Sequence, residues 1–470
     1  MSHFFPDTGA TTPSTEMHIQ TPHNRALLGA VLDYARDRMA NDQPLDFPAT
    51  PAELAARVPR TITPTGLGGP EALRIFEEIL APACISTDHP GYLSFIPTAA
   101  TEAATMFDLA VAACSVYGGS WLEGAGAVHA ENEVLRWLAA QVGLPAGAGG
   151  VFVQGGTIGN LSALVAARFN AQSTAARNGT PVPDRWAIAC SREAHSSLRS
   201  AARVMDVDLL PLDPDPSGRL TGDILRSALD AQPDGGASVC AVVATAGTTN
   251  LGIIDDLAGI GELCRERDIW FHVDGAYGLA AILVPELAPL FAGAEYADSF
   301  IVDPHKWLFT PFDACALVYR DPRVAYRTHS QHAEYLDTLE EETVWNPSDY
   351  AIQLTRRARG LPLWFSLASY GTERYRLAIE STVMTARAVA KIIRETEHLE
   401  LVCDPTLSIV AFSRLGWEAA DYRDWSARLL TAGTGFVTPS SHHGKPILRF
   451  AIVNPRSTLD VLVPILDTLR

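Results

Sequence analysis

The chain has 470 residues, of which 47% are hydrophobic and 19% charged, and its formal net charge is −18. This length predicts two or three domains with well-packed cores, and the negative charge argues against nucleic acid or an anionic membrane as a partner. The sequence shows neither a run of about 18 apolar residues nor a basic segment followed by an apolar core, so we expect no membrane span and no signal peptide. Seven scattered cysteines without a CxxC pair favour a reducing, cytoplasmic setting.

Residues 1–99 show helical patterns but have little core of their own. Apolar side chains recur at helical spacing between residues 25 and 39, and Pro70 favours the start of a second helix over 71–80. An aromatic stretch broken by Pro and Gly follows at 89–98. Its composition leaves open whether it is a domain-linking turn with core aromatics or a functional loop.

A repeated alternation of strands and helices begins near residue 151, after a helix expected over 125–142. The candidate strands are 151–153, 186–190, 207–210, 239–244, 269–273, 299–302 and 315–319, and the candidate helices are 158–169, 195–205, 221–231 and 256–267. Strands interleaved with helices predict an α/β domain with a mostly parallel seven-stranded sheet that is covered on both faces. We assign residues 100–362 to this large domain.

The pattern changes at residue 363. A long helix to about residue 396 is followed by short strands near 399–403, 408–413 and 447–452 and by a last helix over 458–469. This order predicts a smaller α+β domain over residues 363–470.

Two of the candidate strands end in polar clusters, Asp274 to Tyr277 and Asp303 to Lys306. Because ligands bind at the carboxyl ends of strands in α/β sheets, we expect an acid and an amine to meet in one crevice. Only three of the 36 Lys and Arg residues are lysines, and Arg cannot lose the proton that an amine nucleophile must lose. A lysine that forms a Schiff base, with a carboxylate on the pyridinium nitrogen, is the pair that pyridoxal phosphate (PLP) requires.

The segments HVDGAYG (272–278) and DPHKW (303–307) resemble the PLP-dependent group II amino acid decarboxylases, most closely the aromatic-L-amino-acid decarboxylases. The resemblance extends from residue 70 or so to the C-terminus. It implies the type I PLP-dependent transferase fold of aspartate aminotransferase, a PLP cofactor, and a homodimer with a shared active site in which residues 1–99 pack on the partner subunit. It also implies that Lys306 forms the Schiff base and that Asp274 holds the ring nitrogen.

A glycine-rich turn at 153–160 separates a strand from a helix. Backbone N–H groups and the helix dipole can hold an anion at such a place, although a plain tight turn explains the glycines equally well. The resemblance assigns Gly156, Thr157 and Ile158 to the cofactor phosphate.

His195 follows the strand expected at 186–190 and, taken alone, could simply cap the next helix. The resemblance implies instead that its imidazole stacks on the PLP ring and that Ala276 packs against the opposite ring face. It places three further residues near the cofactor, namely Thr249, Asp303 and His305. Asp303 departs from the asparagine of the animal relatives, which changes the polarity near the site.

A long polar loop runs from residue 328 to 350. Loops of this length are usually functional lids or disordered segments. The resemblance assigns Tyr335 as the group that returns a proton to the substrate carbon after carbon dioxide leaves. A loop aromatic that merely packs on the surface is the alternative.

The resemblance assigns six residues to the substrate pocket: Tyr92, Phe95, Thr98, Tyr117, Gly119 and Thr355. Three of them depart from the animal aromatic enzymes, in which Tyr117 is isoleucine, Gly119 is phenylalanine and Thr355 is glycine. The pocket wall is therefore rebuilt. We hypothesise that the hydroxyl group of Thr355 favours a phenolic ring.

Two other groups of residues attract notice. One of Arg356, Arg357 and Arg359 is expected to order the cofactor neighbourhood or the dimer, although the sequence does not say which. His442 and His443 have no further ligands at suitable spacing, so we expect no metal site.

Three hypotheses for the function remain open. The first is a PLP-dependent decarboxylase that converts an L-amino acid, aromatic by resemblance, to its amine and carbon dioxide. The second keeps the cofactor but catalyses other carbanion chemistry, such as an oxygen-consuming aldehyde synthase; Tyr335 disfavours this, because such family members typically lack the tyrosine. The third is a non-catalytic binding protein with the same fold.

Overall fold

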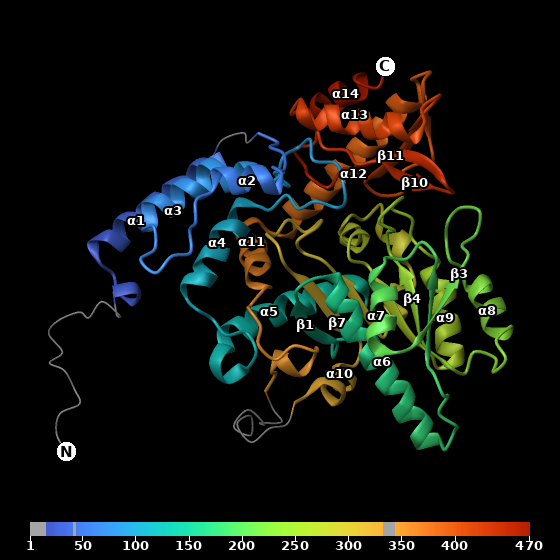
Figure 1. The fold of residues 1–470 in the computed structure, drawn as a ribbon. Coiled ribbons are helices and arrows are strands. Elements are labelled where there is room, and N and C mark those ends of the chain that lie inside the picture. The colour runs from blue at the N-terminus through green and yellow to red at the C-terminus, as the bar shows by residue number, and fades with distance from the viewer. Residues whose placement is uncertain (1–15, 41–43, 332–343) are drawn as a thin grey trace, which may run out of the picture.

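The structure is a computed structural model that describes residues 16–40, 44–331 and 344–470 (Figure 1). An N-terminal helical segment, a large α/β domain and a smaller α+β domain follow one another along the chain. Figure 1 shows the helical segment in blue at one side and the small domain in red above the central sheet.

The large domain is built on a seven-stranded sheet. Its strands are β1 (Gly149–Val153), β2 (Ala187–Ser191), β3 (Asp208–Leu212), β4 (Val239–Thr245), β5 (Trp270–Asp274), β6 (Ser299–Val302) and β7 (Cys315–Tyr319). Their order is β1-β7-β6-β5-β4-β2-β3, and β7 runs antiparallel to both of its neighbours. The predicted strands are all present, and the mostly parallel sheet confirms the expected α/β class.

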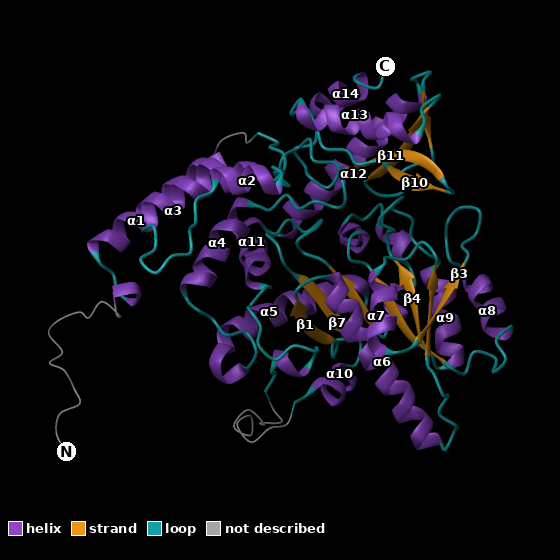
Figure 2. Ribbon diagram, viewed as in Figure 1, coloured by secondary structure: helices purple, strands orange, loops and turns teal. Residues whose placement is uncertain are grey.

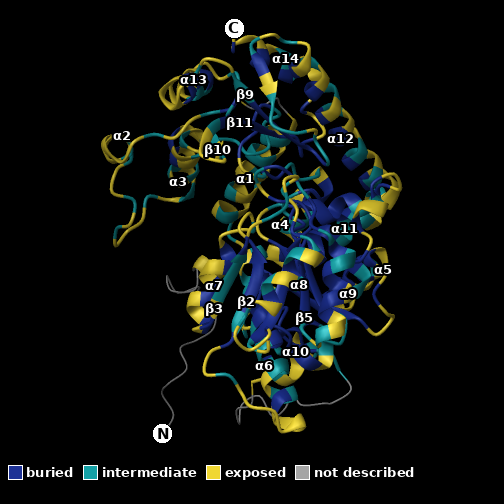
Figure 3. Ribbon diagram, turned by 90° about the vertical axis from the view of Figure 1, so that its right-hand side faces the viewer, coloured by how far each residue is buried: buried dark blue, intermediate teal, exposed yellow. Residues whose placement is uncertain are grey.

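Helices cover both faces of this sheet, as Figure 2 shows. They are α5 (Trp121–Val142), α8 (Gly222–Asp230) and α9 (Leu257–Arg267) on one face and α6 (Gly156–Asn178), α7 (Ser197–Met205) and α10 (Pro322–His329) on the other. Successive strand residues point to opposite faces, so Phe152 packs with α5 whereas Val151 and Val153 pack with α6. Strands covered on both faces must be apolar throughout, and Figure 3 shows the inner strands as the buried centre of the domain, whereas β3 at the edge is only partly buried.

Parallel pairing brings the carboxyl ends of the central strands together. Thr245 at the end of β4 lies opposite Asp274 at the end of β5, and Asp274 in turn lies opposite Ile301 on β6. The polar clusters that follow these strands therefore gather at one edge of the sheet.

The small domain contains an antiparallel sheet in the order β10-β11-β9-β8. Its elements are α12 (Thr372–Arg394), β8 (Leu399–Leu401), β9 (Ile409–Arg414), α13 (Ala419–Thr431), β10 (Ser440–His442), β11 (Lys445–Ala451) and α14 (Leu459–Asp467). The expected α+β character is confirmed. The helices and strands share one apolar core around Phe412, Trp425 and Phe450.

The single long helix predicted from residue 363 to about 396 is wrong, because the chain forms two helices there. Helix α11 (Leu361–Tyr370) ends at Gly371, whose φ of 76° and ψ of 159° cannot continue a helix, and α12 starts at the next residue. Glycine adopts a positive φ at little cost. The break lets α11 pack on the large domain while α12 enters the small one.

Several elements were not predicted. They include helices α2 (Pro51–Arg57), α4 (Glu102–Ala113), α10 and α13 and strand β10. Helices α2 and α10 and strand β10 are eight residues or shorter, too short to show a period, and α4 is apolar at most positions, so its sequence lacks the alternation that marks an amphipathic helix. Helix α13 buries only Tyr422, Trp425 and Leu429, so its apolar stripe is narrow.

The N-terminal helices lie away from the central sheet. Helix α1 (Pro22–Ala40) has no buried residue, and the side chains of Leu28, Val31 and Leu32 are 48%, 39% and 42% exposed. Helix α3 (Gly69–Ile75) continues as a π-helical turn over Phe76–Leu80. The helical spacing is confirmed, but a single chain leaves its apolar stripe uncovered.

Among the residues that the structure describes, no helix combines the length and apolar character needed to cross a bilayer.

A buried histidine at the end of α10 predicts acid sensitivity. His329 Nε2 donates to the Ser162 carbonyl of α6 at 3.1 Å, and burial lowers the pKa of His329 to about 4. Since the unfolded chain binds this proton near its usual pKa of about 6.5, stability is complete above that pH and is lost as the pH falls toward 4. We expect this group alone to lower the free energy of unfolding by about 2 kcal/mol between pH 7 and pH 5.

Urea unfolding of the native chain and of His329→Gln at both pH values measures this effect. Glutamine keeps an N–H donor but does not titrate, so the variant should lose about 2 kcal/mol less on acidification. An equal loss in both proteins would contradict the prediction.

Candidate active site

A cavity of ≈ 280 Å³ lies at the carboxyl ends of β1, β4, β5 and β6. Its lining includes nine of the residues proposed from the sequence: Gly156, Thr157, His195, Thr249, Asp274, Ala276, Asp303, His305 and Lys306. The tenth, Ile158 in the first turn of α6, lies outside this lining. Its side chain packs against the core on that face of the sheet, and its N–H donates to the Gly155 carbonyl at 3.0 Å. Strand order thus brings together groups that are far apart in the sequence.

Lys306 faces a buried carboxylate. Its Nζ lies 2.9 Å from Oδ2 of Asp303, which is 1% exposed. Burial opposes the charged amine, but the charge and hydrogen bond of Asp303, together with the charge of Asp274, outweigh it, so the pKa of Lys306 is raised. Asp303 therefore holds the amine in place and stabilises its charged form.

Asp274 is held by donors on both of its oxygens. Oδ1 accepts from the N–H of Ala276 at 3.2 Å, and Oδ2 accepts from Nδ2 of Asn160 at 2.9 Å. Asn160 lies one helical turn after Gly156, on α6, and is 1% exposed. Hydrogen bonds to a carboxylate favour its ionised form.

The sequence reasoning missed Asn160 and the residues around it. Asn160 also donates to Ser197 Oγ at 2.9 Å and accepts at Oδ1 from His272 Nε2 at 2.9 Å. Two signals could have found them: Asn160 is four residues after Gly156, and His272 is two residues before Asp274 on the same strand face.

The glycine turn keeps the cavity open. A Cβ atom at Gly156 would lie 3.2 Å from Asp303 Oδ2 and 3.4 Å from Ala276 Cβ, so a side chain there would enter the space between these residues. Helix α6 begins at Gly156 and runs for 23 residues. The first N–H groups of a helix have no partner within it and attract anions.

The two histidines on the cavity wall differ in their surroundings. His195 Nδ1 receives hydrogen bonds from Ser197, from Oγ at 2.9 Å and from the backbone N–H at 3.2 Å. His305 Nδ1 lies 2.7 Å from the carbonyl oxygen and 3.2 Å from the backbone nitrogen of Ala314, while its Nε2 lies 3.8 Å from Asp303 Oδ2. Both rings are thus fixed through Nδ1 and keep Nε2 available.

A buried arginine links the small domain to the cavity, and the sequence reasoning did not single it out. Arg449 on β11 is 5% exposed, and its Nη2 donates to the Phe95 carbonyl at 2.7 Å and to the Thr249 carbonyl at 2.8 Å. Burial lowers its pKa to about 10. One guanidinium therefore ties the aromatic loop at 89–98 to a residue of the cavity.

The six residues proposed for the substrate pocket lie outside the lining of this cavity and fall into two groups. In the first, the rings of Tyr92 and Phe95 lie 5.0 and 6.2 Å from that of Phe436, and Thr98 Oγ1 donates to the Thr310 carbonyl at 2.7 Å. This group borders the Arg449 contact through Phe95.

The second group contains Tyr117, Gly119 and Thr355. Tyr117 Oη donates to the Leu354 carbonyl at 3.2 Å, next to the exposed Thr355. A Cβ atom at Gly119 would lie 2.3 Å from Tyr117 Oη. The glycine therefore makes room for the tyrosine, and these two departures from the animal enzymes belong together.

Tyr335, proposed as the proton donor, lies outside the described residues.

The arginine cluster at 356–359 serves three different contacts. Arg356 is buried and pairs with Glu131 at 2.8 and 2.9 Å, and it also donates to the Gly118 carbonyl. Arg357 pairs with Asp108 at 2.5 Å and Arg359 with Asp313 at 2.9 Å. Asp313 lines the cavity, whereas Arg356 supports the Tyr117–Gly119 segment.

No group of three or more His, Cys, Asp or Glu side chains with metal-binding geometry occurs in the part of the chain that the structure describes.

The cavity thus presents an amine, a carboxylate and the start of a helix around one small space. Residues 65–415 match the pyridoxal-dependent decarboxylase conserved domain. The chain belongs to the pyridoxal-dependent decarboxylase family. This match confirms the family that the segments at 272–278 and 303–307 indicated.

Similar proteins have several substrates in their names. An aromatic-L-amino-acid decarboxylase of Bacillus atrophaeus is 29% identical over 82% of this chain and 81% of its own length. An L-2,4-diaminobutyrate decarboxylase of Rhizobium meliloti is 30% identical over 81% of this chain and 77% of its length, and a phenylacetaldehyde synthase of Petunia hybrida is 29% identical over 78% and 77%. These names support amino acid decarboxylation, but they do not agree on the side chain of the substrate.

Solved structures show the same fold. The crystal structure of Oryza sativa TDC with PLP and tryptamine has a TM-score of 0.88 and 25% identity, and the match covers 96% of this chain and 98% of that one. The decarboxylase described here therefore has the expected PLP-dependent transferase fold.

The residues of this decarboxylase fit PLP, its cofactor. Two buried polar atoms on the cavity wall, Gln154 Oε1 and Thr245 Oγ1, have no partner among the described residues and can serve a polar ligand. The turn at Gly156 would receive the phosphate, Lys306 the aldehyde and Asp274 the ring nitrogen. Bound PLP supplies an electron sink for the charge that carbon dioxide leaves behind.

Proposed function

We propose that this decarboxylase converts an aromatic L-amino acid to its amine and carbon dioxide. The observation that carries the proposal is the aromatic cluster of Tyr92, Phe95 and Phe436, which Arg449 fastens to the cavity residue Thr249. Aromatic side chains favour stacked or edge-on contact with another ring. The name of the Bacillus relative agrees with this choice of substrate.

In this proposal each cavity residue has one task. Lys306 would hold the cofactor aldehyde as a Schiff base and Asp274 would face the ring nitrogen, so that bound PLP supplies an electron sink. His195 would stack on the ring and Ala276 would pack against it, Gly156, Thr157 and Ile158 would form the phosphate turn, and Thr249, Asp303 and His305 would complete the surroundings. Tyr335 returns a proton to the substrate carbon.

We further propose a homodimer with a shared active site. Each subunit would consist of an N-terminal helical segment (1–99) that packs on the partner subunit, a large PLP-binding α/β domain (100–362) and a small α+β domain (363–470). The uncovered apolar stripe of α1 supports it, because exposed apolar patches mark association surfaces. The exposed Phe95, at 58%, also needs a neighbour to enclose a substrate. A cytoplasmic location agrees with seven free cysteines, four of them buried.

The second candidate is an aldehyde synthase, which the Petunia relative favours. Tyr335 supports decarboxylation, since synthases of the family typically lack that tyrosine. Oxygen uptake and hydrogen peroxide release during turnover would show aldehyde synthase activity and contradict simple decarboxylation.

A substrate panel tests the choice of side chain. Amine release from tyrosine, tryptophan, dopa and phenylalanine should exceed release from valine, histidine and 2,4-diaminobutyrate. Comparable rates for the last three would contradict an aromatic preference.

The hydroxyl group of Thr355 should affect the preference among the aromatic substrates. We expect Thr355→Gly to lower the ratio of kcat/KM for tyrosine over phenylalanine by about 5- to 10-fold, the size of one lost hydrogen bond to a neutral group. Thr355→Ser keeps the hydroxyl and should keep the ratio. If Thr355→Gly leaves the ratio unchanged, the hydroxyl does not recognise the phenol.

A further inference from the structure

A continuous chain of buried hydrogen bonds crosses the large domain from the amino end of β5 to the active site. It starts at Trp270, whose Nε1 donates to Ser299 Oγ at 2.9 Å, and Ser299 Oγ lies 2.8 Å from His272 Nδ1. His272 Nε2 lies 2.9 Å from Asn160 Oδ1, and Asn160 donates to Asp274. All five side chains are at most 7% exposed.

The two ends of the chain fix the direction of its bonds. An indole N–H can only donate, so Ser299 Oγ accepts from Trp270. At the other end the amide nitrogen of Asn160 donates to Asp274 Oδ2 and Ser197 Oγ, so its Oδ1 faces His272 Nε2, which must donate. A neutral imidazole that donates at Nε2 accepts at Nδ1, so Ser299 turns its own hydrogen to His272 Nδ1.

The state of His272 agrees with this direction. Burial lowers the pKa of His272 to about 4, although the charge of Asp274 works against that shift, so the ring is neutral near pH 7. A neutral ring has one N–H donor only, and Asn160 receives it.

Asn160 then divides the chain into two branches. With Oδ1 occupied by His272, its amide nitrogen must face Asp274 Oδ2 and Ser197 Oγ, both at 2.9 Å. Ser197 accepts this bond and sends its hydroxyl hydrogen to His195 Nδ1. His195 Nδ1 therefore acts as an acceptor, toward both the hydroxyl and the backbone N–H of Ser197.

We propose that Trp270, Ser299, His272 and Asn160 are positioning residues that together hold the carboxylate of Asp274 in place and fix the His195 ring through its Nδ1. The inference rests on the proposed roles of these two residues toward the cofactor. An asparagine whose amide were turned the other way would point an oxygen at Asp274 and repel the carboxylate. The chain removes that possibility.

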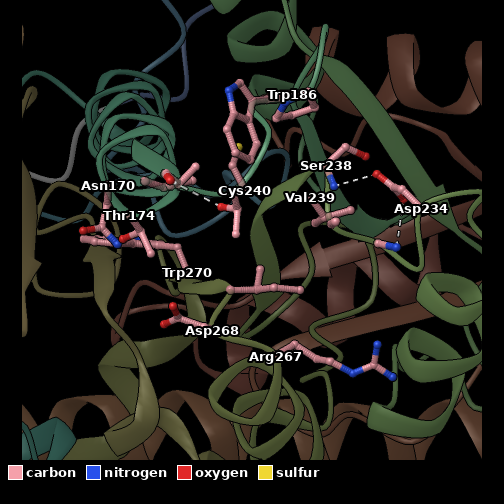
Figure 4. A pocket seen from close by; sticks show the side chains of 18 of the residues that line it. Asn170, Thr174, Trp186, Asp234, Ser238, Val239, Cys240, Arg267, Asp268 and Trp270 are labelled. Carbon is pink, nitrogen blue, oxygen red and sulfur yellow. Dashed lines mark hydrogen bonds between the residues drawn. The ribbon is translucent and has the colours of Figure 1, made fainter. Parts of the chain in front are cut away.

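The far end of the chain offers a matched control. Trp270 and Trp186 both line a second cavity of ≈ 590 Å³ (Figure 4). This cavity lies at the amino ends of β2, β4 and β5, whereas the candidate active site lies at the carboxyl ends of the strands. They are 7% and 8% exposed. Within the described residues Trp186 Nε1 has no hydrogen-bond partner, whereas Trp270 Nε1 starts the chain.

The test measures the dissociation constant of PLP and the visible absorbance of the PLP-bound protein. We expect His272→Leu and Asn160→Ala to weaken PLP binding by about 10- to 100-fold and to shift the visible band, as loss of a hydrogen bond to a charged group predicts. His272→Gln, which keeps an N–H donor toward Asn160, should stay within about threefold of the parent protein. If His272→Leu and His272→Gln behave alike, the proposal is overturned.

The tryptophan pair decides the matter if the substitutions nearer the site do not fold. Trp270→Phe should weaken PLP binding by about 2- to 10-fold, and Trp186→Phe should leave it unchanged. Equal effects of Trp270→Phe and Trp186→Phe on PLP binding would overturn the proposed role of the hydrogen-bond chain. Because both readouts concern bound PLP, a protein that binds PLP but releases no amine would refute the proposed function and leave this test valid.

Discussion

Lys306→Arg is expected to abolish amine release and covalent attachment of PLP. Arginine keeps the charge that Asp303 faces at 2.9 Å, so the buried carboxylate stays paired, but arginine cannot lose a proton and act as an amine. By analogy with loss of the nucleophile in other covalent mechanisms, we expect kcat to fall by about 10³-fold or more.

Borohydride reduction followed by peptide mass analysis measures the attachment directly. The chain has only three lysines, so a single labelled peptide identifies the reacting amine. Lys391→Arg is the matched control, because Lys391 is 73% exposed on α12 and lies 3.9 Å from Glu395, away from the cavity. Label on Lys391 or Lys445, or normal turnover of Lys306→Arg, would refute the assignment.

Asp274→Asn is expected to lower kcat by about 10²-fold or more while leaving the fold intact. The amide retains an oxygen that can accept from Asn160, which now lies 2.9 Å from Oδ2 of Asp274. It carries no negative charge, however, and cannot keep a ring nitrogen protonated. The electron sink should weaken accordingly.

A second buried aspartate serves as control for this change. Asp298 accepts from the N–H of Phe271 at 2.8 Å, and burial raises its pKa to about 6. It lies just before β6, at the amino end of the strands and outside the cavity lining. Asp298→Asn should leave kcat within about threefold of the parent value, since Asp298 lies outside the cavity and touches neither cofactor nor substrate in the proposed mechanism. Equal losses in both variants would mean that Asp274 acts only through stability.

The local features of the fold could be predicted from the sequence. Strands such as 299–302 and 315–319 were located because short apolar runs bounded by polar clusters report on burial. The helix break at Gly371 was missed, because a glycine inside an apolar pattern does not reveal which φ the chain adopts there.

Within the candidate site, local motifs led us to propose the cofactor residues but not the residues that hold them in place. Asp274 and Lys306 stand in short recognisable segments. Asn160 is 114 positions from the carboxylate it holds, and Arg449 is 200 positions from Thr249. Contacts at such separations depend on strand order, which a pattern along the chain does not encode.

By itself the sequence indicated the cofactor, because its segments around Asp274 and Lys306 resemble those of a PLP-dependent family, and the family match confirms this. It also determined the α/β class, since alternating strands and helices allow few other arrangements. Only the tertiary structure decided how these groups are presented. The order of β4, β5 and β6 places their ends side by side, and the buried chain from Trp270 orients Asn160, because a hydrogen bond has a direction only when both partners are in place.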